Sequence, residues 1–122
     1  MYLLMKTIRI TDGKTTIRAV LNGTMAAKDL EKRLPFECSG SDSGIDFCCP
    51  IPRGIFDPVE CQTGWKNGDI CLCNGWFAIL YGGEEQSKSF GTVMIVGHIL
   101  EEDLPLVKEF PEQVTFTVEA EK

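Results

Sequence analysis

Residues 64–87, which read GWKNGDICLCNGWFAILYGGEEQS, decide the fold of this chain. Within them, two apolar runs flank Asn74 and Gly75, and an Asn-Gly pair between apolar runs is the strongest short-range signal for a β-hairpin. We therefore expect residues 69–73 and 76–81 to pair as antiparallel strands across a type I′ turn.

The turn also sets which residues of the hairpin face one another. The expected pairs are Cys73 with Trp76, Leu72 with Phe77, Cys71 with Ala78 and Ile70 with Ile79. Because side chains alternate between the two faces, both faces of this hairpin are apolar, and such strands are covered on both sides. We expect the hairpin at the centre of the molecule, with a core on one face and a helix or loop on the other.

An Asp-Gly turn at residues 12–13 lies between two runs of alternating apolar residues, which predicts a second hairpin near the N-terminus. Its expected pairs are Ile8 with Ile17 and Ile10 with Thr15. Both strands then present their apolar residues on the same side, so this register is self-consistent.

Thr24 can cap a short helix, because its hydroxyl can accept a hydrogen bond from a free amide of the first turn. Ala26, Leu30 and Leu34 follow at a spacing of four and form one apolar stripe. Pro35 ends the helix, since the residue before a proline avoids helical torsions. We expect this helix to plug one end of a barrel or to cover the outer face of the central hairpin.

Residues 36–65 are the least regular part of the chain, because glycines and prolines divide them into turns, with a short strand expected around residues 45–49. A long segment without periodicity is often where function lies. Further on, we expect a buried strand over residues 90–100, a short helix over residues 101–110 and a final strand over residues 113–119.

Together these elements predict a mainly β protein, a small closed antiparallel β-barrel of six or seven strands with one or two short helices. At 122 residues, the chain is expected to form a single domain over residues 1–122. Its 43% hydrophobic and 25% charged residues are ordinary for a globular protein.

The net charge of −6 argues against nucleic acid and against an anionic membrane surface, which both attract basic proteins. No apolar run approaches the roughly 20 residues that cross a bilayer. Residues 1–5 are apolar but too short for the core of a signal peptide. We therefore expect a cytoplasmic protein whose partners include neither nucleic acid nor membrane.

Several short motifs occur in a distinctive order. A helix ends in Leu34 and Pro35, a Gly-Asp-Ile block stands at residues 68–70, Trp-Phe-Ala-Ile-Leu-Tyr-Gly at residues 76–82, and a late strand begins near Gly91. In this order, nearly the whole chain resembles the small bacterial and archaeal cyclophilin-like domain family. The resemblance implies a compact β-barrel of cyclophilin type. It implies little about activity, although some relatives are attached to flavodoxin-like domains.

True cyclophilins isomerise X-Pro bonds with an arginine beside an apolar proline pocket, and their Phe-His-Arg segment has no counterpart here. The residue types that could imitate such a site are Arg53, Phe56, Gln86, Phe90, Met94 and His98. None of them stands in the family's motif, so the resemblance assigns no catalytic residue.

Six cysteines allow three interpretations, a disulfide framework, a metal site or reactive thiols. They are Cys38, Cys48, Cys49, Cys61, Cys71 and Cys73. Without a signal peptide, reduced thiols are expected, and cysteines two apart on a strand lie about 6.6 Å from each other with parallel side chains. The spacing also differs from that of zinc ligands, and His98 is a single imidazole. We expect structural cysteines and no metal, with a redox or sensing thiol as the alternative.

His98 is expected in the apolar strand on the side of Met94, Val96 and Leu100, where a lone histidine is more often structural than catalytic. Trp65, near the end of the central hairpin, is expected to line a groove or to cover the barrel end, beside a polar rim. The candidate ligand-binding residues are Arg53, Trp65, Glu85, Gln86, Ser87 and His98.

No Walker or dinucleotide-binding motif occurs, so no cofactor is expected. The leading hypothesis is a binding module without strong catalysis that holds a small molecule or extended peptide in a groove beside the barrel. One alternative is a weak peptidyl-prolyl isomerase with Arg53 as its cation, and another is a thiol-based redox accessory related to the flavodoxin-linked relatives. The oligomeric state stays open, with a homodimer among the alternatives.

Overall fold

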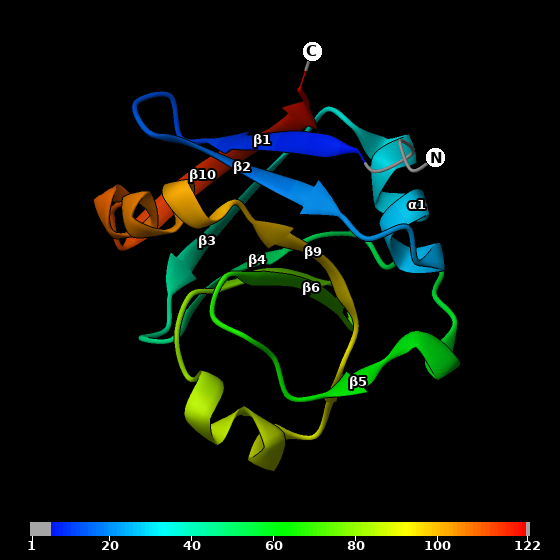
Figure 1. Cartoon of the computed structure of the whole chain (residues 1–122). Coiled ribbons are helices and arrows are strands. Elements are labelled where there is room, and N and C mark those ends of the chain that lie inside the picture. The colour runs from blue at the N-terminus through cyan, green and yellow to red at the C-terminus, as the bar shows by residue number, and fades with distance from the viewer. Residues whose placement is uncertain (1–5, 122) are drawn as a thin grey trace.

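The computed structural model describes residues 6–121, apart from the side chain of Cys73, so the expectations for residues 1–5 and for that thiol lie outside the described residues. Within this range, eight antiparallel strands close into a barrel in the order β1-β10-β3-β4-β7-β6-β9-β2 (Figure 1). They are β1 (Thr7–Thr11), β2 (Thr16–Leu21), β3 (Phe36–Asp42), β4 (Asp46–Pro50), β6 (Asp69–Cys73), β7 (Trp76–Leu80), β9 (Ile95–Ile99) and β10 (Gln113–Ala120). The expected closed antiparallel barrel is confirmed, with more strands than the six or seven predicted.

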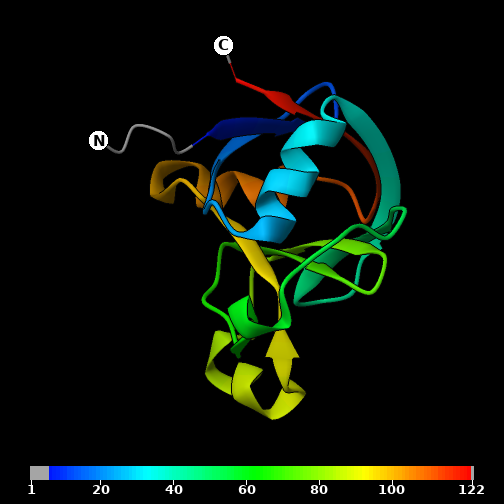
Figure 2. The ribbon, with the colours of Figure 1, turned by 90° about the vertical axis from the view of Figure 1, so that its right-hand side faces the viewer.

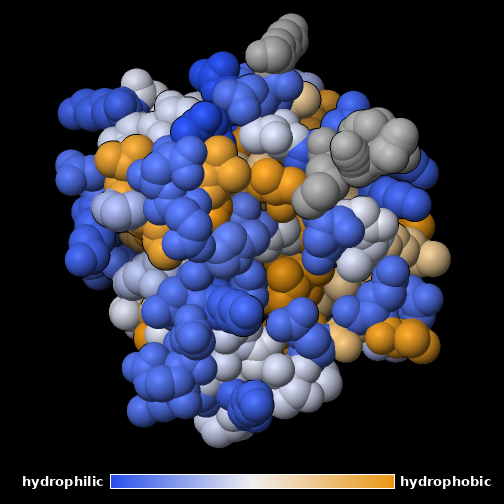
Figure 3. All heavy atoms as spheres, in the orientation of Figure 1, coloured by the Kyte–Doolittle hydropathy of each residue, from blue (hydrophilic) through white to orange (hydrophobic). Residues whose placement is uncertain are grey.

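A small second sheet and several short helices surround the barrel. They are β5 (Gln62–Thr63), β8 (Thr92–Val93), α1 (Met25–Arg33) and the 3₁₀ helices η1 (Pro58–Glu60), η2 (Glu84–Phe90) and η3 (Glu101–Glu109). Over residues 6–121, none of the helices is long and apolar enough to span a membrane. On the face shown in Figure 3, hydrophilic side chains cover most of the surface and hydrophobic atoms show only in separate areas.

The central hairpin forms as predicted. β6 and β7 pair with Ile70 opposite Ile79 and Cys73 opposite Trp76. Asn74 and Gly75 have φ angles of 49° and 88°, and two consecutive positive φ angles are what a type I′ turn requires. The Asn-Gly signal therefore gave both the turn and the register.

Both faces of this hairpin are covered over most of their length, as predicted, although Trp76 at the start of β7 is 46% exposed. On the inner face, Ile70, Phe77 and Ile79 are fully buried in the barrel core. The outer face belongs to a second, smaller core, whose buried members are Trp65, Cys71, Ala78, Leu80, Val93 and Ile95. Val93 of this core comes from β8, which lies with η2 outside the barrel in Figure 2.

Helix α1 plugs the barrel. The Thr24 hydroxyl accepts a hydrogen bond from the amide of Ala27 at 3.2 Å, so the predicted cap is present. Ala26, Ala27 and Leu30 are buried in the same core as the inner face of the hairpin. Figure 2 shows the helix lying across one end of the barrel, which confirms the first of the two positions expected for it.

The register of the N-terminal hairpin differs from the prediction by two residues. Ile8 pairs with Ala19 and Ile10 with Ile17, because the connection has four residues and not two. The Asp12 carboxylate accepts hydrogen bonds from the amides of Lys14 and Thr15 and so holds this longer turn. A shift by two residues leaves every side chain on its expected face.

The expectation of irregular structure over residues 36–65 is wrong at its start, where β3 pairs with β10 and β4. After Phe36, which packs on the core, the inward positions of β3 include the small residues Cys38 and Gly40, so the sequence shows little periodicity. A Cβ at Gly40 would lie 1.8 Å from the carbonyl oxygen of Cys48, so only glycine fits there. The predicted strand around residues 45–49 is present as β4.

The single strand predicted over residues 90–100 is in fact two strands in two sheets. β8 pairs with β5 in the small sheet, whereas β9 lies between β2 and β6 in the barrel. Met94 stands between them, and its carbonyl accepts a hydrogen bond from the Leu72 amide at 3.0 Å. The chain therefore changes sheets at Met94.

A β-bulge then reverses the side-chain alternation within β9. Ile70 pairs with Gly97 and Cys71 with Ile95, which leaves Val96 as the extra residue. Val96 is buried in the barrel core, whereas His98 is half-buried on the outer side. The expectation that His98 shares a side with Val96 is wrong, because a strand without the bulge was assumed.

Helix η3 is joined to β2 by a buried carboxylate. Asp103 accepts hydrogen bonds from the Arg18 amide at 2.9 Å, from Nε at 2.9 Å and from Nη2 at 3.2 Å. These side-chain hydrogen bonds lower the pKa of the Asp103 carboxyl below its ordinary value and raise the pKa of Arg18. The Arg18 side chain is 38% exposed and that of Asp103 is 10% exposed, so water screens the pair only in part.

Replacing Asp103 by asparagine should lower the free energy of unfolding by about 1 kcal/mol near neutral pH, because charged hydrogen bonds are lost at a partly screened site. A lowered pKa means that folding favours the ionised form. The contribution is therefore present above the ordinary pKa of 3.8 and is lost as the pH falls through the lower folded value. Urea unfolding of native and Asp103→Asn protein should thus differ near neutral pH and converge in acid.

Glu102→Gln is the matched control for this comparison. Glu102 lies 3.7 Å from the same Arg18 guanidinium, but its side chain is 70% exposed, so its loss should change stability little. Equal losses in the two variants, or a difference for Asp103→Asn that persists in acid, would contradict the assignment.

Candidate functional site

A cavity of about 280 Å³ lies beside the plugged end of the barrel. It is bordered by α1, by the segment after β4 and by the turn between β6 and β7. Its apolar side chains come from segments far apart in the sequence, and include Ile55, Phe56, Leu72, Trp76 and Met94. Concave sites with apolar walls and a few polar groups are the usual form of small-molecule sites.

The wall formed by residues 51–56 is held at two points. The Ile51 amide donates to the Gly75 carbonyl at 2.8 Å, which ties the start of the wall to the hairpin turn. Arg33, in the last turn of α1, donates from Nη1 to the Pro52 carbonyl at 2.7 Å and from Nη2 to Asp29 at 2.7 Å. The Asp29–Arg33 pair therefore positions this wall against the helix.

Gly54 allows the wall to lie close to that ion pair. A Cβ at this position would be 1.9 Å from Nη2 of Arg33 and 2.0 Å from a carboxylate oxygen of Asp29. Any side chain here would displace the ends of both charged groups. The shape of the cavity thus depends on a glycine, an ion pair and a backbone carbonyl together.

Large apolar side chains remain exposed around the cavity. The exposed fractions of Ile55, Phe56 and Trp76 are 58%, 50% and 46%. Single exposed hydrophobic residues are common, but a group of them around a hollow is typical of a binding site.

The charge of the cavity is opposite to that of the chain. Arg33 and Arg53 both line it, and no aspartate or glutamate does, although the chain carries 18 acidic residues. Arg33 is neutralised by Asp29, whereas Arg53 forms no ion pair within the described range of the chain. The cavity therefore presents one uncompensated guanidinium beside an apolar surface.

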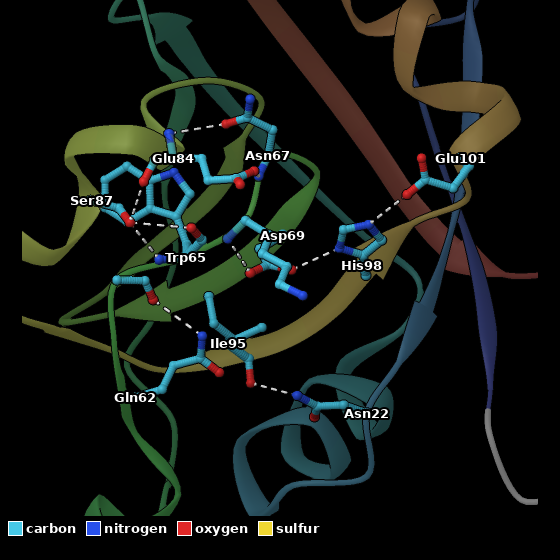
Figure 4. Close-up of polar contacts among 12 residues, drawn as sticks. Asn22, Gln62, Trp65, Asn67, Asp69, Glu84, Ser87, Ile95, His98 and Glu101 are labelled. Atoms are coloured by element: carbon cyan, nitrogen blue, oxygen red, sulfur yellow. Dashed lines mark hydrogen bonds and ion pairs between the residues drawn. The ribbon is translucent and has the colours of Figure 1, made fainter.

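Of the six candidate residues predicted from the sequence, only Arg53 lines this cavity. Trp65 is buried in the second core, and its indole nitrogen donates to the Gly82 carbonyl at 2.8 Å. The buried Ser87 hydroxyl accepts from the Trp65 amide at 2.9 Å, so these two candidates lie together (Figure 4). Glu85 and Gln86 are exposed on η2. Ligand binding by these four residues stays a prediction.

His98, the sixth candidate, lies between two carboxylates (Figure 4). Its Nδ1 is 2.7 Å from Asp69, and its Nε2 is 3.4 Å from Glu101. The Asp69 carboxylate also accepts a hydrogen bond from the Lys66 amide at 2.8 Å. Asp69 therefore links His98 of β9 to the segment before β6. Both ring nitrogens face carboxylates, and the contacts of the described residues place no serine or cysteine on His98. His98 is therefore held between one carboxylate from β6 and one from η3.

The thiols of the described residues lie at several separate places. Cys38 and Cys49 are both buried in the barrel core. Their mutual hydrogen bond, with burial, raises the pKa of Cys38, and the same hydrogen bond lowers the pKa of Cys49. Cys61 lines the cavity, with its sulfur 3.9 Å from that of Met94. Among the residues that the structure describes, no group of three or more His, Cys, Asp or Glu is arranged to hold a metal ion.

The sequence missed the role of Arg33, which reads there as one of several charges on the solvated side of a helix. Its contact with Pro52 joins residues 19 apart and leaves no local pattern. Phe56 and Met94, named above only as residue types that could imitate a proline pocket, do lie with Arg53 at the cavity. Gln86, Phe90 and His98 do not line it.

Known proteins share the architecture of this chain, a closed antiparallel barrel. The model of the cyclophilin-like family matches residues 10–119. The chain therefore belongs to the cyclophilin-like family, as the resemblance of its motifs indicated.

A solved structure of McbB in complex with tryptophan is similar to this chain, with a TM-score of 0.66 and 15% sequence identity. The match covers 92% of this chain and 44% of that chain, so this chain spans less than half the length of that protein. At this level of identity the likeness shows the fold alone. Among curated proteins, none matches the chain.

Gly54→Ala should displace the Asp29–Arg33 pair and move the cavity wall, while the loss of stability stays below about 1 kcal/mol because the displaced groups are the ends of flexible side chains. In ¹H–¹⁵N spectra, we expect shifts for Arg33, the wall and the Gly75 turn. Gly82→Ala is the control, since the nearest atoms to its Cβ would lie at an ordinary 3.7 Å. Unchanged signals at Arg33 in Gly54→Ala would show that the ion pair does not position the wall.

Proposed function

We propose that this protein is a binding module that holds a small molecule, or one side chain of an extended peptide, in the cavity beside α1. The observation that carries the proposal is the cavity itself, which combines exposed apolar side chains with an unpaired arginine. At about 280 Å³ it lies near the lower end of ligand-binding sites, which run from about 300 to 1,000 Å³. A ligand about the size of an amino acid is therefore favoured over a nucleotide.

Binding can be tested by titrating the ¹⁵N-labelled protein with neutral and acidic probes, phenylacetamide, phenylacetate, 4-methylpentanamide and 4-methylpentanoate. We expect shifts of the Trp76 indole N–H and of the Leu72 and Met94 amides, which border the cavity. Removing the Phe56 ring by Phe56→Ala should weaken binding roughly tenfold through lost apolar contact.

Val59→Ala is the matched control, because Val59 is 88% exposed and does not line the cavity. Shifts that scatter over the surface, or equal effects of the two variants, would place binding elsewhere. If none of the four probes shifts any cavity signal, the proposed function is overturned.

A second candidate function is a weak peptidyl-prolyl isomerase. It is favoured by the position of Arg53 beside Phe56 and Met94 at the cavity. Rotation about an X-Pro bond breaks amide resonance and leaves a lone pair on the proline nitrogen. A guanidinium can stabilise that twisted state by a charge-assisted hydrogen bond while an apolar wall holds the proline ring.

The test is cis–trans exchange of a proline tetrapeptide followed by NMR, since uncatalysed exchange takes tens to hundreds of seconds. An isomerase should accelerate exchange, and Arg53→Ala should reduce the acceleration at least about tenfold. Arg9→Ala, which removes an arginine from β1 that pairs with Glu119, is the control of equal charge. Exchange at the uncatalysed rate would retire this candidate without affecting the binding proposal.

A further inference from the structure

We infer that the ligand of the cavity is a small carboxylic acid with an apolar body, and that Arg53 is the residue that selects the acid. The inference rests on the proposed function and names the chemical class of its ligand. The observation behind it is the charge of the cavity. The chain has a net charge of −6, but the described residues that line the cavity include two arginines and no aspartate or glutamate.

The two arginines differ in what they can still bind. Arg33 already donates to the Asp29 carboxylate and the Pro52 carbonyl, so its charge is compensated and its position is set by the fold. Arg53 is exposed, lines the cavity and has no anionic partner among residues 6–121. Arg33 therefore builds the wall, and Arg53 remains available to a ligand.

A guanidinium presents parallel N–H groups that match the two oxygens of a carboxylate. One uncompensated guanidinium balances one negative charge. A phosphate would bring nearly two charges into a protein that is already acidic, and so fits this site less well. A monocarboxylate is the anion that the charge balance favours.

The rest of the ligand is apolar, because of the side chains that stand beside Arg53. Ile55 and Phe56 follow it directly in the chain, and Trp76 faces the same cavity. All three are about half exposed, so a ligand would cover hydrophobic surface that water now contacts. An aromatic or branched aliphatic acid satisfies both requirements within the small volume.

Matched acid and amide pairs test the inference directly, since each pair differs in charge but hardly in shape. Phenylacetate should bind on the order of tenfold more tightly than phenylacetamide, and 4-methylpentanoate more tightly than 4-methylpentanamide, by NMR titration at low ionic strength. Added salt should weaken the acids and leave the amides unchanged.

Arg53→Ala should remove the difference between acid and amide, because the acids lose the charged partner that the neutral amides lack. Arg53→Lys keeps the charge but not the paired N–H groups, so it should restore only part of the preference. Arg9→Ala changes the net charge by the same amount at a distant site and should leave the preference intact.

The outcomes separate this inference from the proposed function. If acids and amides bind equally, or if Arg9→Ala weakens the preference as much as Arg53→Ala, the carboxylate inference is overturned while the binding module stands. If neither acids nor amides shift any signal at the cavity, the proposed function fails and the inference with it.

Discussion

The whole structure depends on one constraint, a hairpin that is apolar on both faces. Most of both faces of β6 and β7 is buried, although Trp76 at the start of β7 is 46% exposed, so the chain must supply two covers. The barrel and helix α1 bury the inner face, with Ile70 and Phe77 at its centre. Trp65 covers the outer face. The Ser87 hydroxyl holds it in place, because it accepts a hydrogen bond from the Trp65 amide and donates one to the Trp65 carbonyl.

The candidate site arises where these two covers meet. The chain returns from the outer cover through Met94, changes sheet there and then enters β9 through the bulge at Val96. Met94 is buried but borders the cavity, and its carbonyl is bound by the Leu72 amide of the central hairpin. The cavity is therefore bounded on one side by the hydrogen-bonded central hairpin and on the other by the segment after β4. A floor of regular strands with a wall of loop residues is a common arrangement for binding sites.

The sequence predicts those features that local signals determine. The Asn74 turn, the register of its hairpin, the cap at Thr24 and the cyclophilin-like barrel all follow from short patterns. The features it misses depend on contacts between distant segments. The inward positions of β3 include small residues and show little periodicity, the bulge at Val96 depends on its partner strand, and the link from Arg33 to the cavity wall has no local sign. Arg53 could be found as a candidate only through the family resemblance, because true cyclophilins use an arginine beside their proline pocket.

The arrangement separates the residues that shape the cavity from the one that gives it charge. Asp29, Arg33 and Gly54 form a fixed support in which each charge is already compensated, so they contribute form and no net charge to a ligand. Arg53 forms no ion pair with the described residues, and under our proposal it alone would supply charge to the ligand. Under the same proposal, exchanging this one exposed residue would change the charge of the ligand that binds without changing the support. This separation gives a physical reason why the fold alone does not state the function, and why we propose that the side chains of residues 51–56 set it.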